Sequence, residues 1–150
     1  MRPEQQLETG VSLNPSRSIF PRDTNIQALG INCRGSIQCG DCSNIGRIAS
    51  LVYHIADDAQ YGNNQQIACS GCFWWQSTFA LCIFPQNIGD RKISGKLIKD
   101  KLGALIAHNC YTCGSIPTED NVPDNNVNNG ELTVNYVLNG CNAAYKDKIC

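Results

Sequence analysis

Ten cysteines in a chain of 150 residues constrain the fold more than any other feature of this sequence. Their number is even, and so many free thiols would be a liability in a reducing cytosol. We therefore expect disulfide bonds and, with them, a secreted protein that works in an oxidising, extracellular environment. Cross-links of this kind allow a small domain to be stable without a large apolar core.

The spacing of the cysteines leaves three interpretations open. Six of them form three C-x-x-C pairs: Cys39/Cys42, Cys69/Cys72 and Cys110/Cys113. Two such pairs are the pattern of a zinc ribbon, and one exposed pair at a helix start is typical of a redox site. Neither arrangement uses the other four cysteines: Cys33, Cys82, Cys141 and Cys150. Structural disulfides are therefore the first interpretation, zinc the second and redox chemistry the third, and spacing alone does not determine the pairing.

Composition excludes several classes of partner. The net charge is −1, so neither nucleic acid nor an anionic membrane is expected as a bulk partner. No apolar run approaches the ~18 residues that a membrane span needs. The first residues contain no apolar segment typical of a signal peptide, and we expect a mature form from which the signal has been removed.

The chain divides into a tail and one domain. Residues 1–28 are polar, contain Pro3, Pro15 and Pro21 and lack cysteine, so we expect a flexible N-terminal tail or a pro-segment. Residues 29–150 hold all the cysteines and form the predicted domain.

Hydrophobic periodicity predicts two helices and several strands. One helix is expected from Ser43 or Asn44 to about residue 60, and a second from about residue 94 to residue 108, with an inner stripe of Leu97, Ile98, Leu102, Leu105 and Ile106. Short strands are expected at residues 29–34, 67–75 (interrupted at Ser70 and Gly71), 79–84 and 130–137. The last strand would direct Leu132, Val134, Tyr136 and Leu138 to the core. We therefore predict an α+β fold with two main helices packed on one face of a mostly antiparallel sheet.

Three segments carry a family resemblance. They are LGINCRGSIQCG at residues 29–40, NCYTCGSIP at 109–117 and GELTVNYV at 130–137. In this order they resemble the killer protein 4 family of fungal killer toxins, founded by a virus-encoded toxin of a smut fungus. The resemblance implies an α/β sandwich and two disulfides, Cys33–Cys110 and Cys39–Cys113. Each would close a loop of roughly 75 residues and contribute about 4 kcal/mol in the chain-entropy model.

Nothing in the sequence indicates an enzyme or a cofactor, and no metal site is predicted once the cysteines are assigned to disulfides. The two histidines, His54 and His108, fall on different predicted helices, and the chain lacks the common nucleophile, phosphate-binding and zinc-protease motifs. We therefore predict no catalytic residue.

Two features are candidates for target binding. Five basic residues lie within eleven positions: Arg91, Lys92, Lys96, Lys99 and Lys101. They form either an ordinary solvated helix face or a cationic patch for an anionic partner. The second feature is Trp74 and Trp75, of which the one that faces outward would anchor a partner.

The resemblance implies a function, but this sequence differs from the family at a residue that is implicated in that function. The family founder blocks calcium channels, and a lysine before a mid-chain cysteine is implicated in that block. Here residues 77–81, before Cys82, contain no basic group, and Arg91 or Lys92 would have to substitute.

Two functional hypotheses follow, besides the zinc-binding one. The first is a secreted, monomeric killer-toxin-like protein that acts on competing fungi or on a plant host by binding a cell-surface or membrane-protein target. The second is a secreted, non-toxic binding module or effector that keeps the same scaffold.

Overall fold

The computed structural model describes residues 30–72, 78–119, 129–141 and 146–150. Apart from Gly30, the described residues belong to one unit formed by residues 31–119 and 126–150. The predicted tail at residues 1–28 lies outside the described residues, and so do Trp74 and Trp75.

The unit is built on an antiparallel sheet of five strands in the order β6-β7-β4-β3-β8. Its strands are β3 (Ala68–Gly71), β4 (Ala80–Gln86), β6 (Gly114–Pro117), β7 (Glu131–Val137) and β8 (Lys148–Ile149). All neighbouring strands are antiparallel. The longest pairing joins β7 to the central strand β4 over seven residues of each strand.

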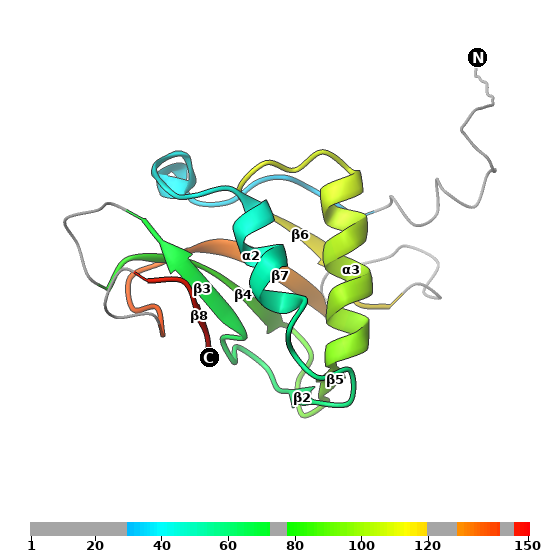
Figure 1. Cartoon of the computed structure of the whole chain (residues 1–150). Coiled ribbons are helices and arrows are strands. Elements are labelled where there is room, and N and C mark those ends of the chain that lie inside the picture. Colours follow the sequence, from blue (N-terminus) through cyan, green and yellow to red (C-terminus); the bar gives the residue numbers. More distant parts are fainter. Residues whose placement is uncertain (1–29, 73–77, 120–128, 142–145) are drawn as a thin grey trace, which may run out of the picture. The chain divides into compact units, whose positions relative to one another are not determined.

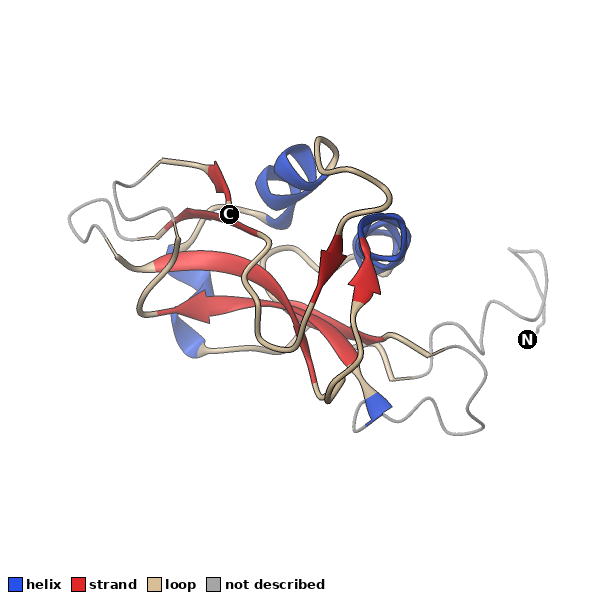
Figure 2. Cartoon of the chain, turned by 90° about the horizontal axis from the view of Figure 1, so that it is seen from below, coloured by secondary structure: helices blue, strands red, loops and turns tan. Residues whose placement is uncertain are grey.

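Two helices cover one face of this sheet (Figures 1 and 2). They are α2 (Ile45–Val52), which is capped by the side chain of Asn44, and α3 (Gly95–Ala107), which is capped by Ser94. Ile48, Ile98 and Leu105 from the helices pack with apolar residues of the sheet in the main core. The predicted α+β fold, with a mostly antiparallel sheet and two helices on one face, is confirmed.

Alternation along the strands produces a second, smaller cluster on the other face. Leu81 and Ile83 of β4 belong to the main core, whereas Ala80 and Cys82 form the second cluster with Cys69 of β3. Successive side chains of a strand point to opposite faces, so one short strand contributes to both clusters.

The first helix is shorter than predicted. It ends at Val52 rather than near residue 60, because backbone groups of the following residues form hydrogen bonds with another helix. Ala59 O accepts the Gly95 amide at 2.8 Å, and Asp57 O accepts the Lys96 amide, so these carbonyls bind the amino end of α3. The two residues of β2 (Gln60–Tyr61) then pair with β5 (Ile93–Ser94) in a two-stranded sheet.

Strand predictions near the cysteines need correction. The predicted strand at residues 29–34 is a single antiparallel bridge between Asn32 and Ser115. Ser70 and Gly71 do not interrupt β3, because they pair with Leu81 and Ala80 of β4. The C-terminal strand β8 was not anticipated, since a strand of two residues has no detectable period.

The burial of three side chains differs from the prediction: two that were expected in the core are exposed, and one that was expected at the surface is buried. Leu138 is 60% exposed because β7 ends one residue earlier, and Ile106 is exposed rather than part of the inner stripe of α3. Lys101 is only 7% exposed, so it does not belong to an exposed cationic face.

All ten cysteines form disulfides, as the first interpretation predicted. Cys33–Cys110 and Cys39–Cys113, the pairs implied by the resemblance, are confirmed. The other three are Cys42–Cys72, Cys69–Cys82 and Cys141–Cys150. No C-x-x-C pair is joined internally, and no thiolate is left to bind zinc, so the zinc-ribbon interpretation of the spacing is wrong for this oxidised chain.

We expect Gly95→Ala to destabilise the protein and Gly103→Ala, in the same helix, to stabilise it slightly. A Cβ on Gly95 would lie 2.0 Å from Ala56 O, whereas one on Gly103 would meet nothing within 4 Å. Overpacking costs about 1–3 kcal/mol, and alanine gains up to about 1 kcal/mol over glycine at an exposed helix position. Urea unfolding of both variants measures the difference, and equal stability would contradict the close packing of Gly95 against Ala56.

We expect Cys141–Cys150 to be reduced before the other disulfides. Cys150 is exposed and Cys141 half-buried, whereas both sulfurs of Cys69–Cys82 belong to residues with no exposed surface. Reduction requires access of a thiolate to a sulfur, so limited reductant should reach the C-terminal bond first. Alkylation followed by peptide mass mapping should then label Cys141 and Cys150, and early label on Cys82 would contradict this order.

Candidate functional site

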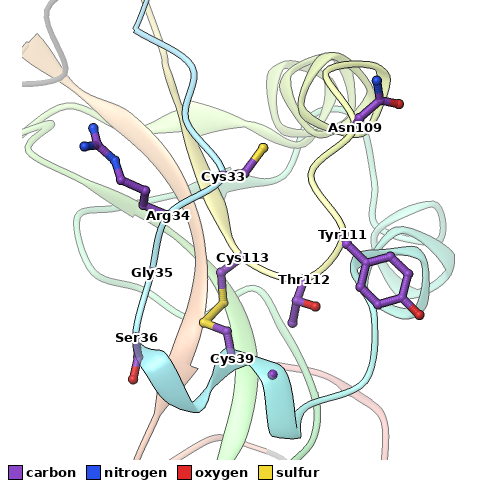
Figure 3. A pocket seen from close by; sticks show the side chains of 10 residues that line it. Cys33, Arg34, Gly35, Ser36, Cys39, Asn109, Tyr111, Thr112 and Cys113 are labelled. Carbon is purple, nitrogen blue, oxygen red and sulfur yellow. A yellow bond between two sulfur atoms is a disulfide. The ribbon is translucent and has the colours of Figure 1, made fainter.

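A surface depression of about 610 Å³ lies between two cysteine-bearing loops (Figure 3). One loop precedes and enters η1 (Ile37–Asp41), and the other follows α3. The lining residues come from both loops: Cys33, Arg34, Gly35, Ser36, Cys39, Gly40, Asn109, Tyr111, Thr112 and Cys113.

Two disulfides and main-chain hydrogen bonds hold the loops together. Cys33–Cys110 and Cys39–Cys113 link them covalently, across sequence separations of 77 and 74 residues. Asn32 exchanges two backbone hydrogen bonds with Ser115, at 3.0 and 2.9 Å. Tyr111 O accepts the Ile45 amide at 2.8 Å, which ties the second loop to the first residue of α2. The depression therefore has a covalently fixed frame.

The side chain of Asn135 joins the first loop to the sheet. This residue lies in β7, and its Oδ1 accepts the Ser36 amide at 2.9 Å. The loop passes so close to the sheet that a Cβ on Gly35 would lie 2.8 Å from Asn135 Oδ1 and 2.7 Å from Cys113 Cβ. Only glycine fits there without displacing a neighbour.

Exposed cationic and aromatic groups line the depression, and an exposed apolar residue adjoins the lining in the sequence. Tyr111 is 74% exposed, and Ile37, which directly follows the lining residue Ser36, is 93% exposed. Arg34 and Tyr111 lie on opposite sides of the Cys39–Cys113 bond (Figure 3). The guanidinium of Arg34 makes no ion pair or hydrogen bond within the described part of the chain, unlike those of Arg47 and Arg91. Such a mixture is typical of a protein-binding surface.

Of the five basic residues considered for target binding, Lys101 is buried and three others are engaged in ion pairs. Arg91 binds Glu119 Oε2 at 3.1 Å and also donates to the carbonyls of Ile88 and Asn129. The other two pairs are Lys96–Asp100, at 3.5 Å, and Lys99–Asp57, at 2.8 Å. Lys92 is exposed and has no ion pair with another described residue.

The Lys99–Asp57 pair changes the acidity of its carboxyl group. The hydrogen bond and the charge of Lys99 hold the pKa of Asp57 below its ordinary value, because both favour the ionised carboxylate. The basic segment is therefore partly neutralised by neighbouring acids.

The structure does not bring the predicted basic residues to the depression. Arg91, Lys92 and Lys96 precede or begin α3, whereas the depression lies beyond its last residue. The 13 residues of α3 span about 20 Å, which separates the two sites. Trp74 and Trp75 lie outside the described residues, so their predicted role stays a prediction.

Sequence reasoning missed Arg34, Ile37 and Tyr111 as surface groups. All three belong to the segments that carry the family resemblance, in which the cysteines are the strongest signal. The sequence gives a weak indication that Ile37 and Tyr111 are exposed, since each is a large side chain between two cysteines and lies outside any periodic stripe.

The described residues do not assemble an obvious acid–base site. His54 follows α2 and His108 ends α3, and the two helices run antiparallel because the chain after α2 contacts the start of α3. The histidines therefore lie at opposite ends of the helical layer. Within the same residues, no helix is long and apolar enough to cross a bilayer.

Fold and site together define a class: a disulfide-linked α+β protein with two helices on an antiparallel sheet and a surface depression framed by two of its disulfides. Comparison with known proteins places it further. The Kp4 family model matches residues 20–138, and a KP4 killer toxin of Ustilago maydis P4 virus is 38% identical over 122 residues, covering 77% of this chain and 85% of the toxin. The chain belongs to the Kp4 killer-toxin family.

We expect Gly35→Ala to disturb the first loop and Gly40→Ala, in the same loop, to leave it unchanged. A Cβ on Gly35 would meet the Cys39–Cys113 bond and Asn135, while one on Gly40 would meet nothing within 4 Å. Gly35→Ala should lower the free energy of unfolding by about 1–3 kcal/mol. Denaturant unfolding of the oxidised proteins checks this, and a Gly40→Ala protein that loses as much stability would contradict it.

Proposed function

We propose that this protein is a secreted, killer-toxin-like growth inhibitor of competing fungi or of plant-host cells. It acts as a monomer, through binding to a cell-surface or membrane-protein target rather than through turnover. Membership of the Kp4 family supports the killer-toxin activity, with a relative whose alignment covers most of both chains. The five disulfides support action outside the cell, where such bonds persist.

Binding as the mode of action is supported by the chemistry of the described surface. The mixed surface around the depression offers anchors but no nucleophile positioned by a base. Nucleic acid is an unsuitable target, since the chain carries a net charge of −1 and three of its described cations are paired in the basic segment alone.

Block of a calcium channel is the finer form of this proposal. A cation presented to the carboxylates of a calcium-selective pore would be its physical basis. In this chain Arg34 and Lys92 are exposed cations without an ion pair in the described residues, and either would serve.

A non-toxic effector or binding module is the second candidate. The observation in its favour is that Arg91, Lys96 and Lys99 are neutralised by carboxylates, so the basic segment offers little free charge to a pore. Binding to host or fungal surfaces without growth arrest would distinguish it.

We expect the oxidised protein to inhibit fungal growth at micromolar concentration, and added calcium to relieve the inhibition if the target is a calcium channel. The measurement is a dose–response on a panel of fungi and on plant seedlings, with and without calcium. Protein that has been reduced and alkylated serves as the control, since it loses the frame of the surface. No inhibition of any organism would contradict the toxin proposal, and inhibition that calcium does not change would leave the toxin but exclude the channel mechanism.

A further inference from the structure

We propose that the rim formed by Arg34, Ile37 and Tyr111 is the surface that docks the target, and that its partner is an acidic extracellular loop of a membrane protein. We call these three residues the docking rim. The proposal rests on the proposed function and names the site and the partner chemistry that this function needs.

The first argument is the exposure of apolar groups on a rigid frame. Ile37 is 93% and Tyr111 74% exposed, although removing apolar side-chain surface from water is favourable. Both belong to loops linked by Cys33–Cys110 and Cys39–Cys113. A surface that is already ordered loses little conformational entropy on binding, so more of the contact energy appears as affinity.

The second argument is charge. Arg47 and Arg91 are each paired with a carboxylate, at 3.1 Å, whereas Arg34 has no partner in the described residues. A guanidinium forms two parallel hydrogen bonds with a carboxylate, which makes an aspartate or glutamate side chain its matching group. The partner is therefore acidic.

The third argument is shape. A recess of about 610 Å³ lies between Arg34 and Tyr111, so a side chain of the partner can enter while the rim contacts its backbone (Figure 3). Tyrosine and arginine are the residue types most enriched among dominant binding contacts. A concave surface on a protein of net charge −1 is poorly suited to an anionic bilayer, so a protein loop fits better than a lipid surface.

The test compares rim variants in binding to cells and in growth inhibition. Fluorescently labelled protein is titrated onto intact fungal cells and plant protoplasts, with flow cytometry as the readout. Tyr111→Ala and Arg34→Glu should each weaken binding about tenfold or more, and Arg34→Lys should weaken it less. Protease treatment of the cells should remove the binding of the wild type, whereas vesicles of phosphatidylcholine and phosphatidylserine should bind little protein.

Two exposed residues away from the depression serve as matched controls. Tyr53→Ala removes a tyrosine that is 75% exposed at the end of α2, and Lys148→Glu makes the same charge reversal as Arg34→Glu, on β8. Both should bind as the wild type does. Intact mass must show five disulfides in every variant, and thermal unfolding must match the wild type, so that lost binding is not misfolding.

The outcomes separate this inference from the proposed function. If the rim variants still inhibit growth while Lys92→Glu does not, the docking rim is overturned and the toxin proposal stays intact. Binding that depends on the rim without growth arrest supports the rim and overturns the toxin activity. Equal binding to vesicles, binding that survives protease, or no binding of the wild type to any cell overturns the acidic-loop partner.

Discussion

The two disulfides that join residues 33–39, which lead into η1, to the segment after α3 are the constraint on which the candidate site depends. Cys33–Cys110 and Cys39–Cys113 fix this segment, whose residue Asn32 forms an isolated bridge with Ser115 of β6, against the end of a helix. Each bond closes a loop of more than 70 residues and so removes much of the entropy of the unfolded chain. The close approach of Gly35 to Cys113 and Asn135 depends on that constraint.

This covalent frame separates the groups that stabilise the protein from those available for binding. The interior is held by Ile48, Ile98 and Leu105 under the helices, and by Cys69–Cys82 on the opposite face of the sheet. In the basic segment, by contrast, three of the cations form ion pairs within the protein, with Glu119, Asp100 and Asp57. Exposed pairs of this kind add little to stability, yet they reduce the charge available to a partner.

The sequence predicted the regular elements well and the surface poorly. The long periodic stripes of α3 and the alternation in β7 identify elements whose burial follows from spacing, and the motif segments identify two disulfides. Pairing of Cys42 with Cys72 depends instead on a bridge that brings distant residues together, which spacing does not encode. The early end of α2 has the same origin, because carbonyls after it bind α3. The isolated exposure of Ile37 likewise comes from tertiary geometry and not from a local pattern.

The proposed docking rim lies on a frame that tolerates substitution of its exposed side chains. Substitution of an exposed residue away from packing contacts usually alters stability by less than about 0.5 kcal/mol. Ile37 and Tyr111 are such residues, while the backbone that carries them is fixed by sulfur bonds and by Asn135. Selection on the target can therefore act on these side chains without loss of the fold.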